Sequence, residues 1–227
     1  MKTSFNISIL GGRGYVGQEI IKIINNHPNF FISDIYSKTS HGKLVDDYTK
    51  SKSLTYKLLE RPDKLDFTDI DIVIMALSNN ESSNYIKSIE EHDSNIIIID
   101  ISADYRFNDG WAYKLPEIAA QTKDKRISNP GCYASAIQFS LFPIKHLING
   151  KVSCMGISGY SGAGATPNEK NDPNNLEGNI IPYSLTSHIH EKEVMMHCYE
   201  KLSFSPHVAN FFRGILITSH IQLTKKS

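Results

Sequence analysis

Cys132 lies in the sequence Asn-Pro-Gly-Cys-Tyr (residues 129–133), directly before a segment in which apolar residues recur at helical spacing. Proline fixes φ and glycine accepts backbone angles that other residues avoid, so the Pro-Gly pair predicts a turn. The apolar spacing predicts a helix over residues 133–147. A thiol at the start of a helix faces unpaired N–H groups and the positive end of the helix dipole, which favour the nucleophilic thiolate. The alternative is a small buried cysteine that packs under the helix.

A second group of titratable residues is the run His-Ile-His-Glu-Lys-Glu (188–193), which leads into a predicted helix that ends near Leu202. His190 titrates near neutral pH, and Glu193, one helical turn later, is placed to orient its ring for acid–base chemistry. The two histidines also suggest a metal site, but the H-E-x-x-H pattern is absent and no further ligand follows at that spacing. We therefore predict no metal. A solvated surface histidine remains the alternative.

Near the N-terminus, glycines at 11, 14 and 17 follow a predicted strand (5–10) and precede a predicted amphipathic helix (16–26). This strand–turn–helix order is typical of sites that bind a dinucleotide pyrophosphate, because glycines allow close backbone approach and the helix start supplies N–H donors. A plain tight turn is the alternative, since the spacing is not the commoner G-x-G-x-x-G. The expected cofactor contacts in the turn are Gly11, Arg13, Gly14, Tyr15, Val16 and Gly17.

The next predicted strand (30–36) ends in Ser37 and Lys38. An NAD site usually carries an acidic residue here for the ribose hydroxyls. A hydroxyl and a cation favour a 2′-phosphate instead, so Ser37 and Lys38 predict NADP. Asp34 within the strand weakens this inference, and an ordinary polar loop is the alternative.

Strand and helix patterns alternate through the first half of the chain. Residues 71–77 and 95–101 are nearly continuous apolar runs, as in parallel strands buried on both faces, with a predicted helix (82–91) between them. A weaker strand is predicted at 54–59. These patterns predict an α/β fold with a Rossmann-type doubly wound parallel sheet, whose ligands bind beyond the carboxyl ends of the strands.

The second half holds predicted strands at 152–158, 203–209 and 214–223. A small-residue loop (159–165) follows the first of them; it either offers N–H donors to a ligand or is a flexible linker. Residues 166–182 are rich in Asn, Pro and Asp and predict a long loop.

Composition excludes several classes of protein. Lys+Arg and Asp+Glu both number 24 in 227 residues, so no basic field attracts nucleic acid or an anionic membrane. Three widely separated cysteines form neither a disulfide framework nor a zinc pattern, which suits a reducing compartment. No apolar run is long enough to span a bilayer. The first strand begins so near Met1 that we expect no signal peptide and a cytoplasmic protein.

Taken in order, seven segments resemble the N-acetyl-gamma-glutamyl-phosphate reductase family, NADP-dependent reductases of arginine biosynthesis. The segments are GGRGYVG (11–17), DISADYRF (100–107), LPE (115–117), NPGCY (129–133), GYSGAGATP (159–167), PYSLTSHIHEKEV (182–194) and PHVANFFRGI (206–215). The later ones are especially similar to the reductase half of the fungal bifunctional kinase–reductase and to some bacterial relatives. The resemblance covers nearly the whole chain, and the ordered set is far more specific than any one segment.

The resemblance implies Cys132 as nucleophile, His190 as acid–base residue and Glu193 as its carboxylate, with a thioester reduced by NADPH. It places Ser161 and Gly162 near the nicotinamide. The expected substrate contacts are Asn129, Ser102, Arg106, His188 and Arg213. The implied substrate is N-acetylglutamyl phosphate. The chain is expected to form a homo-oligomer and to work with acetylglutamate kinase.

The resemblance also implies two domains: an NADP-binding domain over 1–131 and an α+β substrate and dimerisation domain, with a mixed or antiparallel sheet, over 132–227. Relatives continue past the Arg-Gly strand, so we expect the second domain to be incomplete and to lack a closing segment. Another departure is Leu77-Ser78-Asn79, where relatives have a Leu-Pro-His-like loop.

Two other functions remain open. An aspartate-semialdehyde dehydrogenase-like reductase shares the fold and the Cys–His chemistry, although the His-x-His-x-x-Glu run and the Pro-His…Arg-Gly segment count against it. A shortened, non-catalytic NADP-binding or regulatory module is the third candidate.

Overall fold

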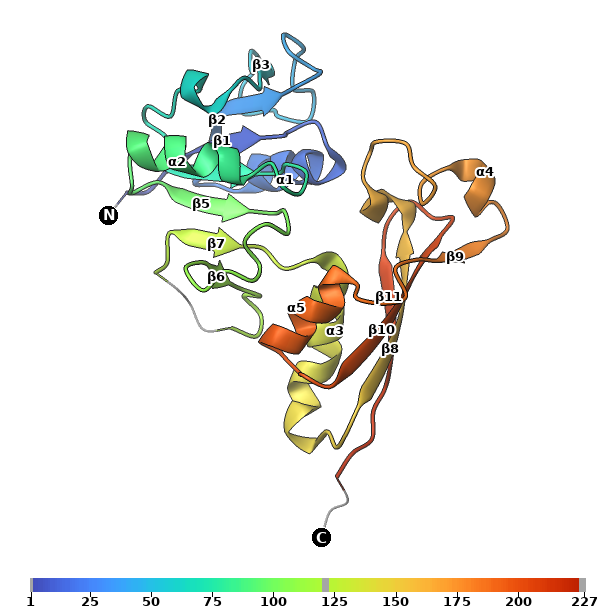
Figure 1. The fold of residues 1–227 in the computed structure, drawn as a ribbon. Coiled ribbons are helices and arrows are strands. Elements are labelled where there is room, and N and C mark those ends of the chain that lie inside the picture. Colours follow the sequence, from blue (N-terminus) through green and yellow to red (C-terminus); the bar gives the residue numbers. More distant parts are fainter. Residues whose placement is uncertain (1, 120–122, 225–227) are drawn as a thin grey trace. The chain divides into compact units, whose positions relative to one another are not determined.

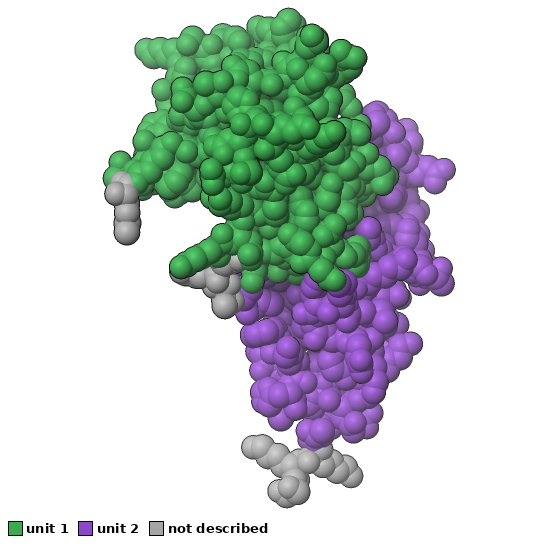
Figure 2. Space-filling model, turned by 60° about the vertical axis from the view of Figure 1, so that its left-hand side comes forward, with its two compact units in different colours: residues 1–114, 121–129 green, residues 115–120, 130–227 purple. Residues whose placement is uncertain are grey.

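The computed structural model describes residues 2–119 and 123–224 (Figure 1). The chain forms two compact units, coloured separately in Figure 2: Met1–Lys114 with Gln121–Asn129, and Leu115–Ala120 with Pro130–Ser227. We keep residues 1–131 and 132–227 as the proposed functional domains. No helix within the described residues is both long and apolar enough to cross a membrane.

The first unit is built on a seven-stranded sheet in the order β3-β2-β1-β4-β5-β7-β6, and every neighbouring pair is parallel. Its strands are β1 (Phe5–Leu10), β2 (Phe30–Ser37), β3 (Lys57–Leu58), β4 (Ile72–Met75), β5 (Ile97–Asp100), β6 (Ala112–Tyr113) and β7 (Arg126–Ser128). The predicted doubly wound parallel sheet is confirmed. Strand order reverses between β1 and β4, the position at which such sheets bind ligands beyond their carboxyl ends.

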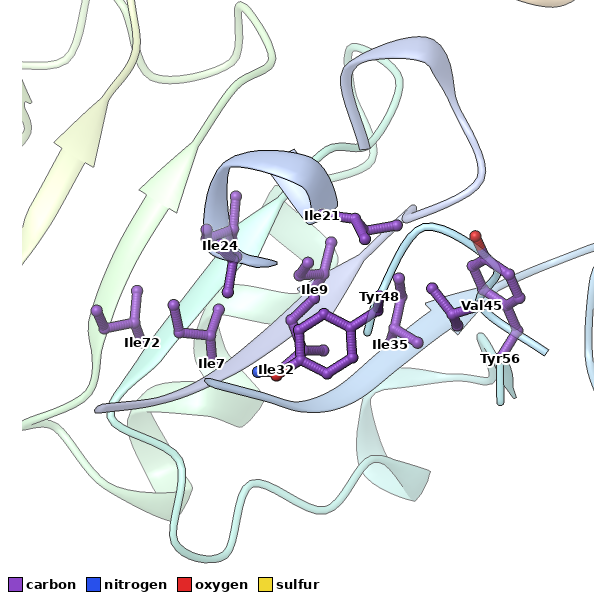
Figure 3. Close-up of a cluster of buried hydrophobic side chains, with 11 residues drawn as sticks. Ile7, Ile9, Ile21, Ile24, Ile32, Ile35, Val45, Tyr48, Tyr56 and Ile72 are labelled. Atoms are coloured by element: carbon purple, nitrogen blue, oxygen red, sulfur yellow. Dashed lines mark hydrogen bonds between the residues drawn. The ribbon is translucent and has the colours of Figure 1, made fainter. Parts of the chain in front are cut away.

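Alternation along β1 directs side chains to both faces of this sheet. Ile7 and Ile9 pack with Ile21 and Ile24 of α1 (Tyr15–Asn26), as Figure 3 shows. Leu10 instead joins the opposite cluster, which includes Tyr85 and Ile89 of α2 (Ser83–His92). Both faces of the strand are therefore covered, which explains the continuous apolar runs in the sequence.

Lys50 fastens the end of α1 to the start of β2. Its Nζ donates hydrogen bonds to the carbonyl oxygens of Ile24 (2.9 Å), His27 and Phe30 (2.7 Å). The last carbonyl oxygens of a helix receive no hydrogen bond from within the helix. An ammonium that donates to them therefore stabilises the turn.

We expect Lys50→Met to lower the free energy of unfolding by about 2 kcal/mol, because charge-assisted hydrogen bonds are lost while the aliphatic stem is kept. Urea denaturation followed by circular dichroism measures the change. Lys52→Met is the matched control, since Lys52 is exposed and should alter stability by less than about 0.5 kcal/mol. Equal effects of the two substitutions would contradict the assigned role of Lys50.

The second unit contains a four-stranded mixed sheet in the order β11-β8-β10-β9. Its strands are β8 (Val152–Gly159), β9 (Ile180–Pro182), β10 (Leu202–Ala209) and β11 (Ile215–His220). β8 and β10 are parallel, whereas β9 and β11 run antiparallel to their neighbours. Helices α3 (Cys132–Leu141) and α5 (Ile189–His197) pack against this sheet around Tyr133 and Phe204 (Figure 1). The predicted mixed sheet is confirmed.

Several predicted element bounds were wrong. The α-helix expected to reach residue 147 ends at Leu141 and continues as a 3₁₀ segment, Phe142–Leu147, because Pro143 has no N–H for an α-helical bond. α5 ends at His197 rather than near Leu202. The strand predicted at 54–59 shortens to β3, and the one predicted at 214–223 shortens to β11.

Several short elements were also not anticipated. The predicted loop at 166–182 holds α4 (Pro173–Leu176) and β9, and the strands β6 and β7 are too short to show any periodicity in the sequence. A further short 3₁₀ segment, η1 (Pro62–Lys64), precedes β4.

Candidate active site

The thiol of Cys132 stands at the first residue of α3 and is exposed. The helix begins here because the preceding Gly131 has extended backbone angles (φ −67°, ψ 153°) and caps the helix without a side chain. The Sγ atom therefore lies at the positive end of α3, as the sequence predicted. The other two cysteines differ: burial raises the pKa of both Cys154 and Cys198, which disfavours their thiolates.

Glu193 connects this turn with His190. Its carboxylate is completely buried, and Oε2 accepts a hydrogen bond of 2.9 Å from the N–H of Gly131. Its Oε1 lies 3.7 Å from Nε2 of His190, a residue that is itself largely buried. Because α5 packs against α3, one carboxylate contacts both the backbone next to the nucleophile and the candidate acid–base residue.

His188, an expected substrate contact, forms the N-cap of α5. Its Nδ1 accepts a hydrogen bond of 3.1 Å from the N–H of His190. The ring is buried, and its centroid lies 4.8 Å from that of His190 and 5.4 Å from that of Phe204. Burial, together with the charge of Lys170, lowers the pKa of His188 to about 4. The ring is therefore neutral near pH 7, with its proton on Nε2 because Nδ1 is an acceptor.

A cluster of buried hydroxyl groups lies beside the nucleophile, and sequence reasoning missed it. The hydroxyl groups of Tyr133, Tyr183 and Ser158 lie close to one another, and the hydroxyl of Tyr133 donates a hydrogen bond to the carbonyl of His207. Burial is the largest cause of the raised pKa of both tyrosines. The charge of an ionised Cys132 raises the pKa of both further. Gly156 makes room, since a Cβ there would lie 2.5 Å from the Tyr133 ring. A glycine inside a predicted strand was the available signal.

The small-residue loop after β8 is an ordered corner. Tyr160 and Ser161 donate backbone hydrogen bonds of 3.0 and 2.9 Å to the carbonyls of Phe211 and Phe212. The corner includes a 3₁₀ turn, η3 (Tyr160–Ala163), which counts against the flexible linker, one of the two alternatives for this loop. Ser161, Gly162 and Arg213 thus come from two segments that are joined through their backbones.

In the first unit, the glycine turn packs tightly against its neighbouring backbone, which is possible only because side chains are absent. Gly11 has φ +87°, and a Cβ there would lie 2.2 Å from the carbonyl oxygen of Ala76. A Cβ on Gly17 would lie 2.7 Å from the Gly11 oxygen. Gly14 caps α1 without a side chain, and Tyr15 and Val16 in the first turn are exposed. These features fit a dinucleotide pyrophosphate held by the N–H groups of the helix start.

We expect Gly17→Ala to weaken NADPH binding at least about 10-fold, because the added Cβ must displace the backbone of the turn. Fluorescence titration with NADPH measures the dissociation constant. Gly110→Ala is the control: its Cβ would meet only the flexible end of the Asn108 side chain, at 3.2 Å. Unchanged affinity in Gly17→Ala would contradict a pyrophosphate site at this turn.

The predicted ribose-phosphate contacts have partners within the protein. Oγ of Ser37 accepts the N–H groups of Thr39 (3.2 Å) and Ser40 (3.1 Å) and so shapes its own turn. The exposed Lys38 pairs with Glu81 at 2.7 Å. Asp34, the acidic residue that argued for NAD, forms an ion pair with Lys57. A cation therefore remains at the end of β2, although it shares its charge with a carboxylate.

Three expected substrate contacts lie beyond the carboxyl ends of β5 and β7. Ser102 is buried, and its Oγ donates a hydrogen bond to Asp100. Burial raises the pKa of Asp100 despite this hydrogen bond. Arg106 is only 8% exposed, and it donates to the carbonyl oxygens of Asn129 (3.0 Å) and Ile101 (2.8 Å). The two side chains thus support the loops of the first unit, while Asn129 itself is exposed.

The described residues contain no group of three or more His, Cys, Asp or Glu placed to hold a metal ion. The predicted site residues fall into four groups: the glycine turn with Ser37 and Lys38; the Ser102, Arg106 and Asn129 loops; the Cys132, His188, His190 and Glu193 cluster; and the corner of Ser161, Gly162 and Arg213. A dinucleotide-type sheet, followed along the chain by a unit with an exposed cysteine and a His–Glu pair, fits the class of dinucleotide-dependent oxidoreductases.

Two family models match the chain. The NAD binding domain of semialdehyde dehydrogenase matches residues 6–125, and the dimerisation domain of the same enzymes matches residues 132–227. Among solved structures, aspartate semialdehyde dehydrogenase II from Vibrio cholerae has a TM-score of 0.77 at 15% identity, covering 97% of this chain and 74% of that one. The enzyme from Candida albicans, solved with NADP, has a TM-score of 0.73 at 15% identity and covers 99% and 73%. These two likenesses show the fold.

Sequence relatives are more specific. The chain is 39% identical over 227 residues to the N-acetyl-gamma-glutamyl-phosphate reductase of Stenotrophomonas maltophilia, covering 98% of this chain and 71% of that protein. It is 43% identical to Protein arg11, mitochondrial, of Schizosaccharomyces pombe, covering 96% of this chain and 25% of that protein. The chain belongs to the N-acetyl-gamma-glutamyl-phosphate reductase family. It spans about a quarter of the length of the fungal relative.

Proposed function

We propose that this protein reduces N-acetyl-L-glutamyl 5-phosphate to N-acetyl-L-glutamate 5-semialdehyde with NADPH and releases phosphate. The observation that carries the proposal is the exposed Cys132 at the start of α3, joined through Gly131 and Glu193 to His190. Membership of the family supports the choice of substrate.

In this mechanism the Cys132 thiolate attacks the acyl carbon, and the carbon–oxygen bond to phosphate breaks, which gives a thioester and free phosphate. NADPH supplies the hydride that reduces the thioester carbonyl. N–H groups at the start of α3 stabilise the oxyanion in both steps. His190 accepts and returns protons during these steps, while Glu193 keeps the His190 ring in place. Breaking the carbon–sulfur bond then releases the semialdehyde and restores the thiolate.

We infer that Gly11, Arg13, Gly14, Tyr15, Val16 and Gly17 hold the NADP pyrophosphate, that Ser37 and Lys38 meet its 2′-phosphate, and that Ser161 and Gly162 meet the nicotinamide. The inferred substrate contacts are Asn129, Ser102, Arg106, His188 and Arg213. For His188 only the Nε2 side is available to a ligand, because Nδ1 accepts a hydrogen bond from the backbone.

We further infer a homo-oligomer formed through residues 132–227, since these match a dimerisation domain. A functional partnership with acetylglutamate kinase follows from the resemblance to the fungal bifunctional enzymes. The cytoplasm is the proposed compartment, although the relative from Schizosaccharomyces pombe is named mitochondrial.

The test is phosphate-dependent oxidation of two aldehydes, N-acetylglutamate semialdehyde and aspartate semialdehyde, followed by the absorbance of NADPH. We expect turnover of the first aldehyde with NADP at a kcat/KM at least about 100-fold above that of the second, because a buried polar site discriminates strongly against a substrate that lacks its partner groups. A preference for aspartate semialdehyde would support the rival dehydrogenase. NADPH binding without turnover, and without acylation of Cys132 by an acyl-phosphate mimic, would support a non-catalytic module.

A further inference from the structure

An open hollow of about 720 Å³ lies in the second unit, between the loop that follows η3 and the strand β9. Lys170 and Tyr183 line it, together with the side chains of Asn168, Asn175 and Asn179. None of these residues was assigned a role by the sequence patterns. The hollow is a candidate for the part of the substrate that does not react.

The loop that carries Lys170 is held by its own side chains. Asn168 donates from Nδ2 to the carbonyl of Thr166 (2.9 Å), and its Oδ1 accepts the N–H of Lys170 at 3.0 Å. Asn171 donates to the carbonyls of Gly164 (2.9 Å) and Thr166 (2.8 Å). These bonds fix the backbone on both sides of Lys170. The lysine is therefore presented by an ordered loop.

The ammonium of Lys170 is only partly solvated, yet no carboxylate lies within 4 Å of it among the described residues. Its Nζ lies 4.8 Å from the centroid of the Tyr183 ring, a cation–π contact. That contact satisfies none of the three N–H donors, and Glu169, its sequence neighbour on the same hollow, forms no ion pair with it. A cation in this setting favours an anionic ligand, which would replace the missing partner.

Lys170 lies near the candidate catalytic residues but not beside the thiol. Tyr183 separates them: Lys170 lies over the Tyr183 ring, while the Tyr183 hydroxyl lies close to that of Tyr133, the residue next to Cys132. The positive charge of Lys170 also lowers the pKa of His188, whose ring centroid lies 4.8 Å from that of His190. An anionic group at Lys170 would therefore sit about one aromatic ring away from the hydroxyl cluster around the nucleophile.

This separation selects one of the two anionic ends of the proposed substrate. The phosphate leaves from the carbon that the thiol attacks, whereas the α-carboxylate lies several bonds farther along the molecule. We propose that Lys170 binds the α-carboxylate of the N-acetylated amino-acid substrate in this hollow. The inference rests on the proposed function for the identity of the substrate, but binding of a carboxylate does not require turnover.

The test measures how ligands protect Cys132 from iodoacetamide, with the alkylated peptide quantified by mass spectrometry. N-acetyl-L-glutamate and its α-methyl ester are the probes, since they differ by one charge. In the unsubstituted protein the acid should protect at about 10- to 100-fold lower concentration than the ester, the usual effect of one charge-assisted hydrogen bond. Lys170→Met should abolish this difference by weakening the acid alone, and Lys170→Arg should preserve most of it.

Lys192→Met is the matched control, because Lys192 is exposed on α5 and should leave both protection constants unchanged. Equal protection by acid and ester in the unsubstituted protein, or no protection by either, would overturn the proposal. So would an equal loss for acid and ester in Lys170→Met, which would indicate a structural effect. Inorganic phosphate is the third probe: if Lys170→Met weakens its protection instead, the site belongs to the phosphate. A charge-dependent difference without any aldehyde oxidation would retain the carboxylate site and reject the proposed reaction.

Discussion

Replacing Cys132 with serine is expected to lower kcat for phosphate-dependent oxidation of N-acetylglutamate semialdehyde by about 10⁴-fold or more. A serine hydroxyl in the same position stays protonated at neutral pH, and an ester in place of the thioester is a poorer hydride acceptor. The free energy of unfolding should change by less than about 0.5 kcal/mol, because the side chain is exposed. Steady-state kinetics and urea denaturation together measure the two effects.

Cys198→Ser provides the control for this substitution. Cys198 directly follows α5 in the same unit, but burial raises the pKa of its thiol and the proposed reaction does not use it. Its substitution should leave kcat within about 3-fold. Normal turnover by the Cys132→Ser variant would reject covalent catalysis at this thiol, whatever the substrate proves to be.

The sequence predicted those elements of the fold that are specified by residues close together in the chain. A few neighbouring residues are enough to predict the Gly11 turn and the strands β4 and β5. The parallel sheet follows from the order of these elements. Pro143, which ends the α-helix after Cys132, also stands in the sequence, although the apolar spacing alone predicts a longer helix. By contrast, β9 exists only because it pairs with β10, which comes twenty residues later, and no local pattern records that pairing.

In the candidate site, too, the sequence predicted the residue types but not the contacts between distant parts of the chain. Residue types indicated a thiol at a helix start and a His–Glu pair, but not that Glu193 accepts a hydrogen bond from Gly131, 62 residues earlier in the chain. Ser102 and Arg106 were expected to contact substrate, whereas in the structure Ser102 donates to Asp100 and Arg106 donates to backbone carbonyls. A polar side chain reveals its chemistry in the sequence; its partner is decided by the fold.

Glu193→Gln is expected to lower kcat about 100-fold while changing stability little. The amide oxygen of glutamine can still accept the N–H of Gly131, so the turn before the nucleophile is kept. The negative charge beside His190 is lost, and with it the support for the ring when it carries a proton. Kinetics and urea denaturation on the same preparation separate the two roles of the carboxylate.

Glu193→Ala should behave differently, because it removes both roles. The N–H of Gly131 would lose its buried acceptor and a cavity would remain, which should cost about 3 kcal/mol of stability on top of the kinetic loss. Glu191→Gln is the matched control on the same helix: its carboxylate accepts the N–H of Phe204 at 2.7 Å and lies outside the proposed chemistry, so kcat should stay within about 3-fold. Full activity in Glu193→Gln, with instability only in Glu193→Ala, would mean that this carboxylate merely holds the turn. The chemistry would then depend on Cys132 and His190 alone.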